Sequence, residues 1–80
     1  MKITVLLFAQ YREVVGAGEI ELELESDATV GDAVETLRGL PGFAALPDAP
    51  AVAVNRQYAS PDHVLCPDDE VALIPPVAGG

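Results

Sequence analysis

The segment Glu19-Ile20-Glu21-Leu22-Glu23-Leu24-Glu25 alternates glutamate and aliphatic residues without exception. Successive side chains of a β-strand point to opposite faces of the sheet, so this pattern predicts a strand with three aliphatic residues on one face and four carboxylates on the other. A strand with one wet face is typical of antiparallel sheets. The chain must therefore build a sheet with one apolar face that another element covers.

The segment from Thr29 to Gly39 predicts the helix that covers this face. Its apolar residues recur at helical spacing, at Val30, Ala33, Val34 and Leu37. Thr29 is expected to cap the helix, with Asp32 completing a capping box, and Gly39 to end it in a left-handed turn. One amphipathic helix on one face of a sheet is the simplest layered solution.

The other elements are short. Apolar residues on both faces between Ile3 and Phe8 predict a central strand, or a strand with one face on the helix and the other on a partner. The sequence further predicts a helical turn over 10–15 and a loop over 40–50 with a short turn at 43–46. It also predicts strands over 51–54, 57–58 and 70–74. Asn55-Arg56 predicts a tight turn, and Pro67-Asp68-Asp69 a type I turn.

This order of elements predicts an α+β protein with the β-grasp, or ubiquitin-like, fold: a mixed four- to five-stranded sheet with one main helix packed on one face. At 80 residues the chain forms one small domain with no room for an internal active site. We expect the domain over residues 1–74 and an extended tail over residues 75–80 that ends in Gly79-Gly80. The first and last strands would lie side by side in the middle of the sheet.

Charge excludes several classes of partner. Thirteen acidic against four basic residues give a net charge of -9, which disfavours nucleic acid and anionic lipid and favours basic protein surfaces. The only cysteine, Cys66, cannot form an internal disulfide, and the apolar run at the start is too short to span a membrane. We therefore expect a cytoplasmic protein.

The chain has no internal catalytic set. His63 and Cys66 lie three residues apart, but Pro61 and Pro67 bracket them and oppose a helix that would bring them together. The glutamates of the alternating segment spread along a flat strand rather than converge on one ion, so we expect a solvated face. The sequence thus predicts no metal site, no bound cofactor and no enzyme activity of the chain alone.

The tail is the candidate functional segment. Six residues, Pro75, Pro76, Val77, Ala78, Gly79 and Gly80, reach roughly 20 Å when extended, the depth of a pocket in another protein. The two glycines remove every Cβ, so the backbone and the terminal carboxylate can approach reacting groups closely. An adenylated carboxylate accepts a sulfur or amine nucleophile, so the tail suits the carriage of a group.

The stretch Asp69-Glu70-Val71-Ala72-Leu73-Ile74-Pro75-Pro76-Val77-Ala78-Gly79-Gly80 closely resembles the ending of the molybdopterin synthase small subunit, the MoaD family of MoaD/ThiS-type ubiquitin-like sulfur carriers. Leu7-Phe8-Ala9-Gln10-Tyr11-Arg12-Glu13 resembles the opening strand and turn of that family, and Val52-Ala53-Val54-Asn55 its middle strand. The similarity spans essentially the whole chain. One departure is local, because Pro67-Asp68-Asp69 replaces an Asp-Gly-Asp turn.

The resemblance implies a sulfur carrier in molybdenum cofactor biosynthesis. An adenylating partner of MoeB type would use ATP to activate Gly80, a sulfur donor would convert it to a thiocarboxylate, and the tail would deliver sulfur to a cyclic pyranopterin in the large, MoaE-type subunit. Two small and two large subunits would form the synthase. Alternatives are a carrier for thiamine thiazole synthesis, a ubiquitin-like modifier, or an interaction module. For docking we expect Phe8, Leu73 and Pro75, each of which could instead belong to the core.

Overall fold

The computed structural model describes residues 1–44 and 46–75 of the chain. Its helices and strands follow the order of the predicted segments. In chain order they are β1 (Lys2–Leu6), α1 (Ala9–Val15), β2 (Glu19–Glu23), α2 (Val30–Arg38), β3 (Ala51–Val54), β4 (Gln57–Tyr58) and β5 (Glu70–Ile74).

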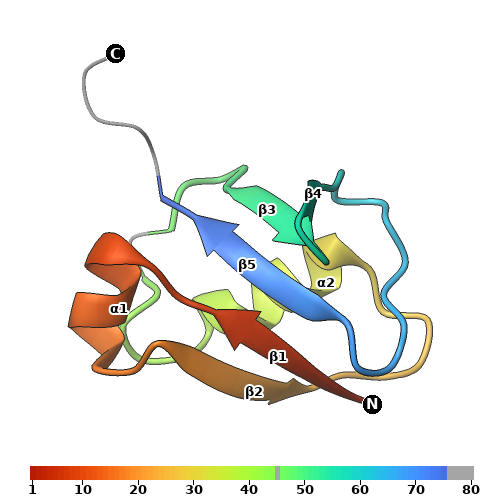
Figure 1. Ribbon diagram of the computed structural model, residues 1–80, viewed down its shortest axis with the longest axis horizontal. Coiled ribbons are helices and arrows are strands. Elements are labelled where there is room, and N and C mark those ends of the chain that lie inside the picture. The colour runs from red at the N-terminus through yellow and green to blue at the C-terminus, as the bar shows by residue number, and fades with distance from the viewer. Residues whose placement is uncertain (45, 76–80) are drawn as a thin grey trace.

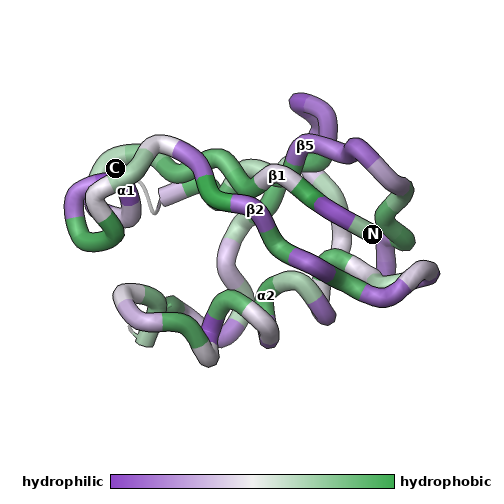
Figure 2. The backbone as a smooth tube through the Cα atoms, turned by 90° about the horizontal axis from the view of Figure 1, so that it is seen from below, coloured by the Kyte–Doolittle hydropathy of each residue, from purple (hydrophilic) through white to green (hydrophobic). Residues whose placement is uncertain are grey.

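The strands form one five-stranded sheet in the order β2-β1-β5-β3-β4. β1 and β5 are parallel, and the other neighbours are antiparallel. α2 lies across one face of this sheet, and α1 sits at the end of β1 (Figure 1, Figure 2). The predicted β-grasp fold is confirmed, with the first and last strands adjacent at the centre.

The core lies between the sheet and α2. In the sheet it is built from every second residue of the central strands, so Ile3 and Val5 of β1 and Val71 of β5 are fully buried. From the other side, Leu37 of α2 and Phe43 of the following loop are buried against them. The alternation of the strands and the stripe of α2 thus meet in one apolar layer.

α2 begins with the predicted capping box. The Thr29 hydroxyl oxygen accepts a hydrogen bond from the Asp32 N–H at 3.2 Å, and the Asp32 carboxylate accepts one from the Thr29 N–H at 2.9 Å. The next free N–H groups also have partners, because Val30 donates to the His63 carbonyl and Gly31 to the Pro61 carbonyl, both at 2.9 Å. The first N–H groups of α2 therefore all have hydrogen-bond acceptors within the domain.

Two predictions about turns are wrong. Gly39 ends α2 with φ -81°, a right-handed conformation, and its N–H bonds back to the last turn of the helix. At Cys66-Pro67-Asp68-Asp69, the Asp69 N–H donates to the Cys66 carbonyl at 3.1 Å while Asp68 has φ +70°. A positive φ at the third residue makes this a type II turn, which aspartate tolerates better than most residues. By contrast, Asn55 and Arg56 both have positive φ, as a two-residue hairpin turn requires.

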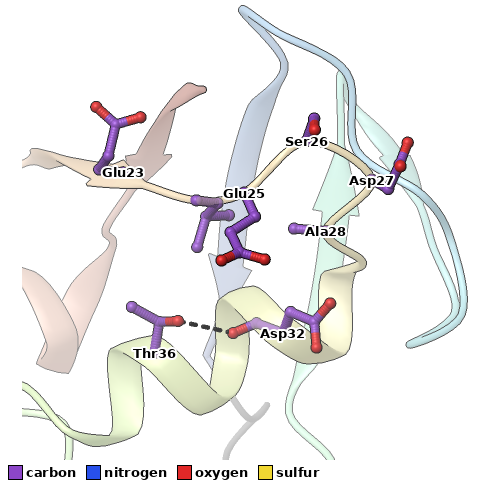
Figure 3. A pocket seen from close by; sticks show the side chains of 8 residues that line it. Glu23, Glu25, Ser26, Asp27, Ala28, Asp32 and Thr36 are labelled. Carbon is purple, nitrogen blue, oxygen red and sulfur yellow. Dashed lines mark hydrogen bonds between the residues drawn. The ribbon is translucent and has the colours of Figure 1, made fainter.

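The alternating segment ends sooner than predicted. β2 stops at Glu23, and Figure 3 shows the Glu23 carboxylate pointing away from α2 while the Glu25 carboxylate points toward it. The expected row of four carboxylates is therefore three, at Glu19, Glu21 and Glu23. β1 likewise ends at Leu6, and Phe8 becomes the residue that precedes α1.

Tyr11 supplies a test of the core. Its side chain is 6% exposed, and its hydroxyl has no hydrogen-bond partner among the residues that the structure describes. A buried unpaired hydroxyl destabilises the fold, so Tyr11→Phe should raise the free energy of unfolding by about 1 kcal/mol in urea titrations. Tyr58→Phe, at a tyrosine that is 79% exposed, is the matched control and should change little. A loss of stability in Tyr11→Phe would reveal a partner for the hydroxyl.

Glu23 predicts a pH dependence. The amino group of Met1 lies 2.8 Å from the Glu23 carboxylate. Its hydrogen bond and then its positive charge, with a smaller effect of Lys2, hold the pKa of Glu23 below the ordinary value of 4.5. The folded pKa is thus below the unfolded one, so the stabilisation is complete above the ordinary value and disappears as pH falls through the folded pKa.

The urea midpoint of Glu23→Gln should consequently lie below that of the unaltered chain near neutral pH, and the gap should close in acid. Glu21→Gln removes a carboxylate that has no ion pair within the described ranges and is the control. A gap for Glu23→Gln that stays constant down to strongly acidic pH would contradict this role of the ion pair.

Candidate functional site

The base of the predicted tail is the part of the site that the structure describes. Pro75 follows β5 directly and is partly buried. Pro76, Val77, Ala78, Gly79 and Gly80 lie outside the described residues, so their predicted role and the division into domain and tail stay predictions. What the structure adds is how the strand before the tail is held.

β5 is held on both sides. It pairs with β1 from Thr4↔Glu70 to Leu6↔Ala72 and with β3 from Ala51↔Ile74 to Val54↔Val71. A central strand with both edges paired cannot slide without breaking both ladders. The residue that carries the tail therefore leaves from a fixed point of the sheet.

Asn55 fixes the other end of β5. Its side-chain amide donates to the Asp69 carboxylate at 2.9 Å and accepts from the Glu70 N–H at 3.0 Å, while its own N–H donates to the Glu70 carbonyl at 2.8 Å. The second oxygen of Asp69 accepts from the Cys66 N–H at 2.8 Å. The β3–β4 turn and the turn before β5 are thus joined at the start of this strand.

The sheet face opposite α2 carries an apolar surface. Residues that share this face, by strand register and alternation, border a shallow hollow of about 460 Å³. We call its apolar lining the apolar half of the open face; it consists of Leu6, Phe8, Ala53, Tyr58, Ala72 and Ile74. Phe8 is 44% exposed and Tyr58 is 79% exposed, so two aromatic side chains on this face are in contact with water.

This surface continues to the base of the tail. A second hollow of about 410 Å³ shares Tyr58 and Ile74 with the first and adds Pro47, Pro50 and Pro75. Exposed apolar side chains that gather on one face make it a candidate protein–protein contact site. A partner that covers the open face would therefore lie next to the first residue of the tail.

Of the three residues expected either to dock or to belong to the core, Leu73 is a core residue. Its side chain is 0% exposed and lies in the core, because it shares a face of β5 with the buried Val71. Phe8 is exposed on the open face and Pro75 is partly exposed beside it, and their role in docking stays a prediction. The sequence reasoning missed Tyr58 and Ile74, although Ala72 and Ile74 alternate with the residues of the core face.

The other candidate sites do not bring reactive or metal-binding side chains together among the described residues. His63 and Cys66 are both exposed, and no group of three His, Cys, Asp or Glu side chains in residues 1–44 and 46–75 is arranged to hold a metal ion. The acidic hollow in Figure 3 brings Glu25, Asp27 and Asp32 to one region, but Asp32 is used by the helix cap. In the same described ranges, no helix is long and apolar enough to cross a membrane.

Comparisons with known proteins give matches to one family that extend over nearly the whole chain. Residues 5–80 match the sequence profile of the ThiS family. The chain is 40% identical over 87 residues to the molybdopterin synthase sulfur carrier subunit of Escherichia coli, covering 98% of this chain and 99% of that protein. The subunit of the same name from Chlamydomonas reinhardtii is 36% identical over 83 residues, with 100% of both chains covered. The crystal structure of the small archaeal modifier protein SAMP1 from Haloferax volcanii superimposes with a TM-score of 0.86 at 32% identity, again with 100% of both chains covered.

Two substitutions distinguish the core face of β5 from the open face. Leu73→Ala should lower the free energy of unfolding by about 2–5 kcal/mol, because it leaves a cavity in the core. Phe8→Ala should lower it by about 1 kcal/mol or less, because much of this side chain is already in water. Chemical denaturation of both variants measures the difference. Equal losses would mean that Phe8 is a core residue.

Proposed function

The chain belongs to the ThiS family, and on that premise we propose that it is the sulfur carrier subunit of a molybdopterin synthase. The observation that carries the proposal is the full-length similarity to sulfur carrier subunits, in a family match that extends to Gly80 itself. The paired β5 strand supports it, because a carrier needs a tail that starts from a fixed point.

The proposed cycle begins with activation of the tail. The Gly80 carboxylate attacks the α-phosphorus of ATP on an adenylating enzyme of MoeB type, and pyrophosphate leaves. A sulfur nucleophile at the level of hydrosulfide then attacks the acyl-adenylate carbon, AMP leaves, and the tail ends in a thiocarboxylate. Two adjacent glycines let both reacting partners reach this carbon without meeting a side chain. In this proposal the partner enzymes supply the catalytic groups of these steps.

Delivery takes place on the large, MoaE-type subunit. The thiocarboxylate sulfur forms a bond to a carbon of the cyclic pyranopterin phosphate while an oxygen substituent leaves that carbon with the electron pair of the broken carbon–oxygen bond. Water then cleaves the bond between the sulfur and the Gly80 carbon. The product keeps the sulfur, and Gly80 returns as a carboxylate. In this proposal sulfurtransferase activity belongs to the assembled synthase, with two small and two large subunits, and the small subunit is its sulfur donor.

The open face is the docking surface that best fits this cycle. Its apolar half lies beside Pro75, so a partner seated there receives a tail that begins at the edge of the contact. Large exposed aromatic residues such as Phe8 and Tyr58 are frequent anchors in protein interfaces. The adenylating enzyme and the large subunit act in turn, and we propose that both use this face.

A ubiquitin-like modifier is the second candidate, because the SAMP1 structure fits the chain so closely. A modifier would join Gly80 to lysine amines as an amide, and such conjugates would survive strong reductant and denaturant. A thiazole carrier for thiamine synthesis would share the thiocarboxylate but bind a thiazole synthase. Pull-downs with the large synthase subunit and a thiazole synthase separate these two carriers.

The proposed function predicts a mass change. Incubation with ATP, the adenylating enzyme of MoeB type and a sulfur donor should replace one terminal oxygen by sulfur in the intact mass. Deletion of Gly80 should abolish this change while leaving the urea midpoint unaltered, because the last of the core residues that the structure describes is Leu73, seven positions earlier. The control adds a residue after Gly80, which should also prevent the reaction. Persistent absence of the sulfur-bearing species from the unaltered chain would disprove the carrier function.

A further inference from the structure

The three glutamates of β2 lie on the same sheet face as the apolar half. In the antiparallel pair of β1 and β2, Glu19 is opposite Leu6, Glu21 is opposite Thr4 and Glu23 is opposite Lys2. Directly opposite residues of such a pair point to the same side of the sheet. Figure 2 shows hydrophilic and hydrophobic residues alternating along β2, and α2 lying over one side of the sheet. The open face thus has an apolar half and an acidic margin.

Two of the three glutamates of the acidic margin have no ion pair among the described residues, although Lys2 lies opposite Glu23 and Arg56 borders the hollow of the apolar half. The ion pairs within residues 1–44 and 46–75 are Met1 with Glu23 and Glu35 with Arg38, so Glu19 and Glu21 meet no cation at ion-pair distance there. Glu70 adds a further carboxylate beside Thr4 on the same face. The simplest interpretation of the glutamates on β2 is that their charges protect the free edge of this strand from pairing with another chain.

The size of an ordinary protein interface indicates that the glutamates of β2 do more than protect the strand edge, because a partner on the apolar half would also contact them. Neighbouring strands are about 4.8 Å apart, so the row on β2 lies roughly 10 Å from Ala72 and Glu70 on β5. A specific contact covers about 800 Å² on each partner, which is a patch roughly 28 Å across. A partner centred on the apolar half therefore also covers Glu19 and Glu21. Carboxylates that lose water without gaining a cation would oppose that binding.

We propose that the large synthase subunit, where it covers the apolar half, carries a strip of basic side chains that meets Glu19 and Glu21. The identity of this partner rests on the proposed function. The basic strip accelerates association by attracting the acidic margin, and it sets the orientation in which the apolar half docks. Apolar contact then holds the complex, and the tail at Pro75 faces the partner.

The test is the rate of association with the purified large subunit, measured over a range of salt concentrations. The double variant Glu19→Gln with Glu21→Gln should associate about tenfold more slowly at low salt and show a shallower dependence on salt. The charge-matched control is Glu35→Gln with Asp62→Asn, which removes two exposed carboxylates that border a hollow beside α2 and do not line the open face. This control should change the rate much less.

The outcomes separate the two proposals. Equal slowing by both double variants would mean that only net charge matters and would overturn the basic strip. Unchanged association together with new aggregation of the Glu19/Glu21 variant would assign the row to edge protection and overturn it as well. Failure of the unaltered chain to bind the large subunit would overturn the proposed function and this inference together. Far-ultraviolet circular dichroism of each variant checks that the fold is intact.

Discussion

The parallel pairing of β1 with β5 is the constraint on which the rest of the structure depends. It places the first and last strands together at the centre, with β2 and β3 on their outer sides. Parallel neighbours need a long connection that crosses a face of the sheet, and here that connection contains α2. The helix that closes the core therefore follows from the pairing that anchors the tail.

Local patterns predicted the elements well. Three features depend only on residues close together in the sequence, and each appears in the structure. They are the capping box at Thr29 and Asp32, the spacing of the apolar residues of α2 and the alternation of β2. The hairpin turn at Asn55 and Arg56 belongs to the same class. The left-handed conformation expected at Gly39 is the exception among these local predictions, because Gly39 is right-handed.

The errors occurred where tertiary contacts decide. Asp68 adopts a positive φ because Asp69 and Asn55 bind the surrounding backbone, a network that joins residues distant in sequence. Leu73 and Ile74 are similar aliphatic residues, and only the packing of α2 assigns the first to the core and the second to the open face. The sequence thus left Leu73 open between docking and core, and the structure places it in the core.

The double pairing of β5 also has a mechanical consequence. A force on Pro75 directed along β5 would load the hydrogen bonds to β1 and to β3 all at once, in shear, instead of opening them one after another. The bonds from Asn55 at the far end of the strand would resist the same displacement. An enzyme that pulls on Pro75 along β5 would therefore act against both strand pairings together.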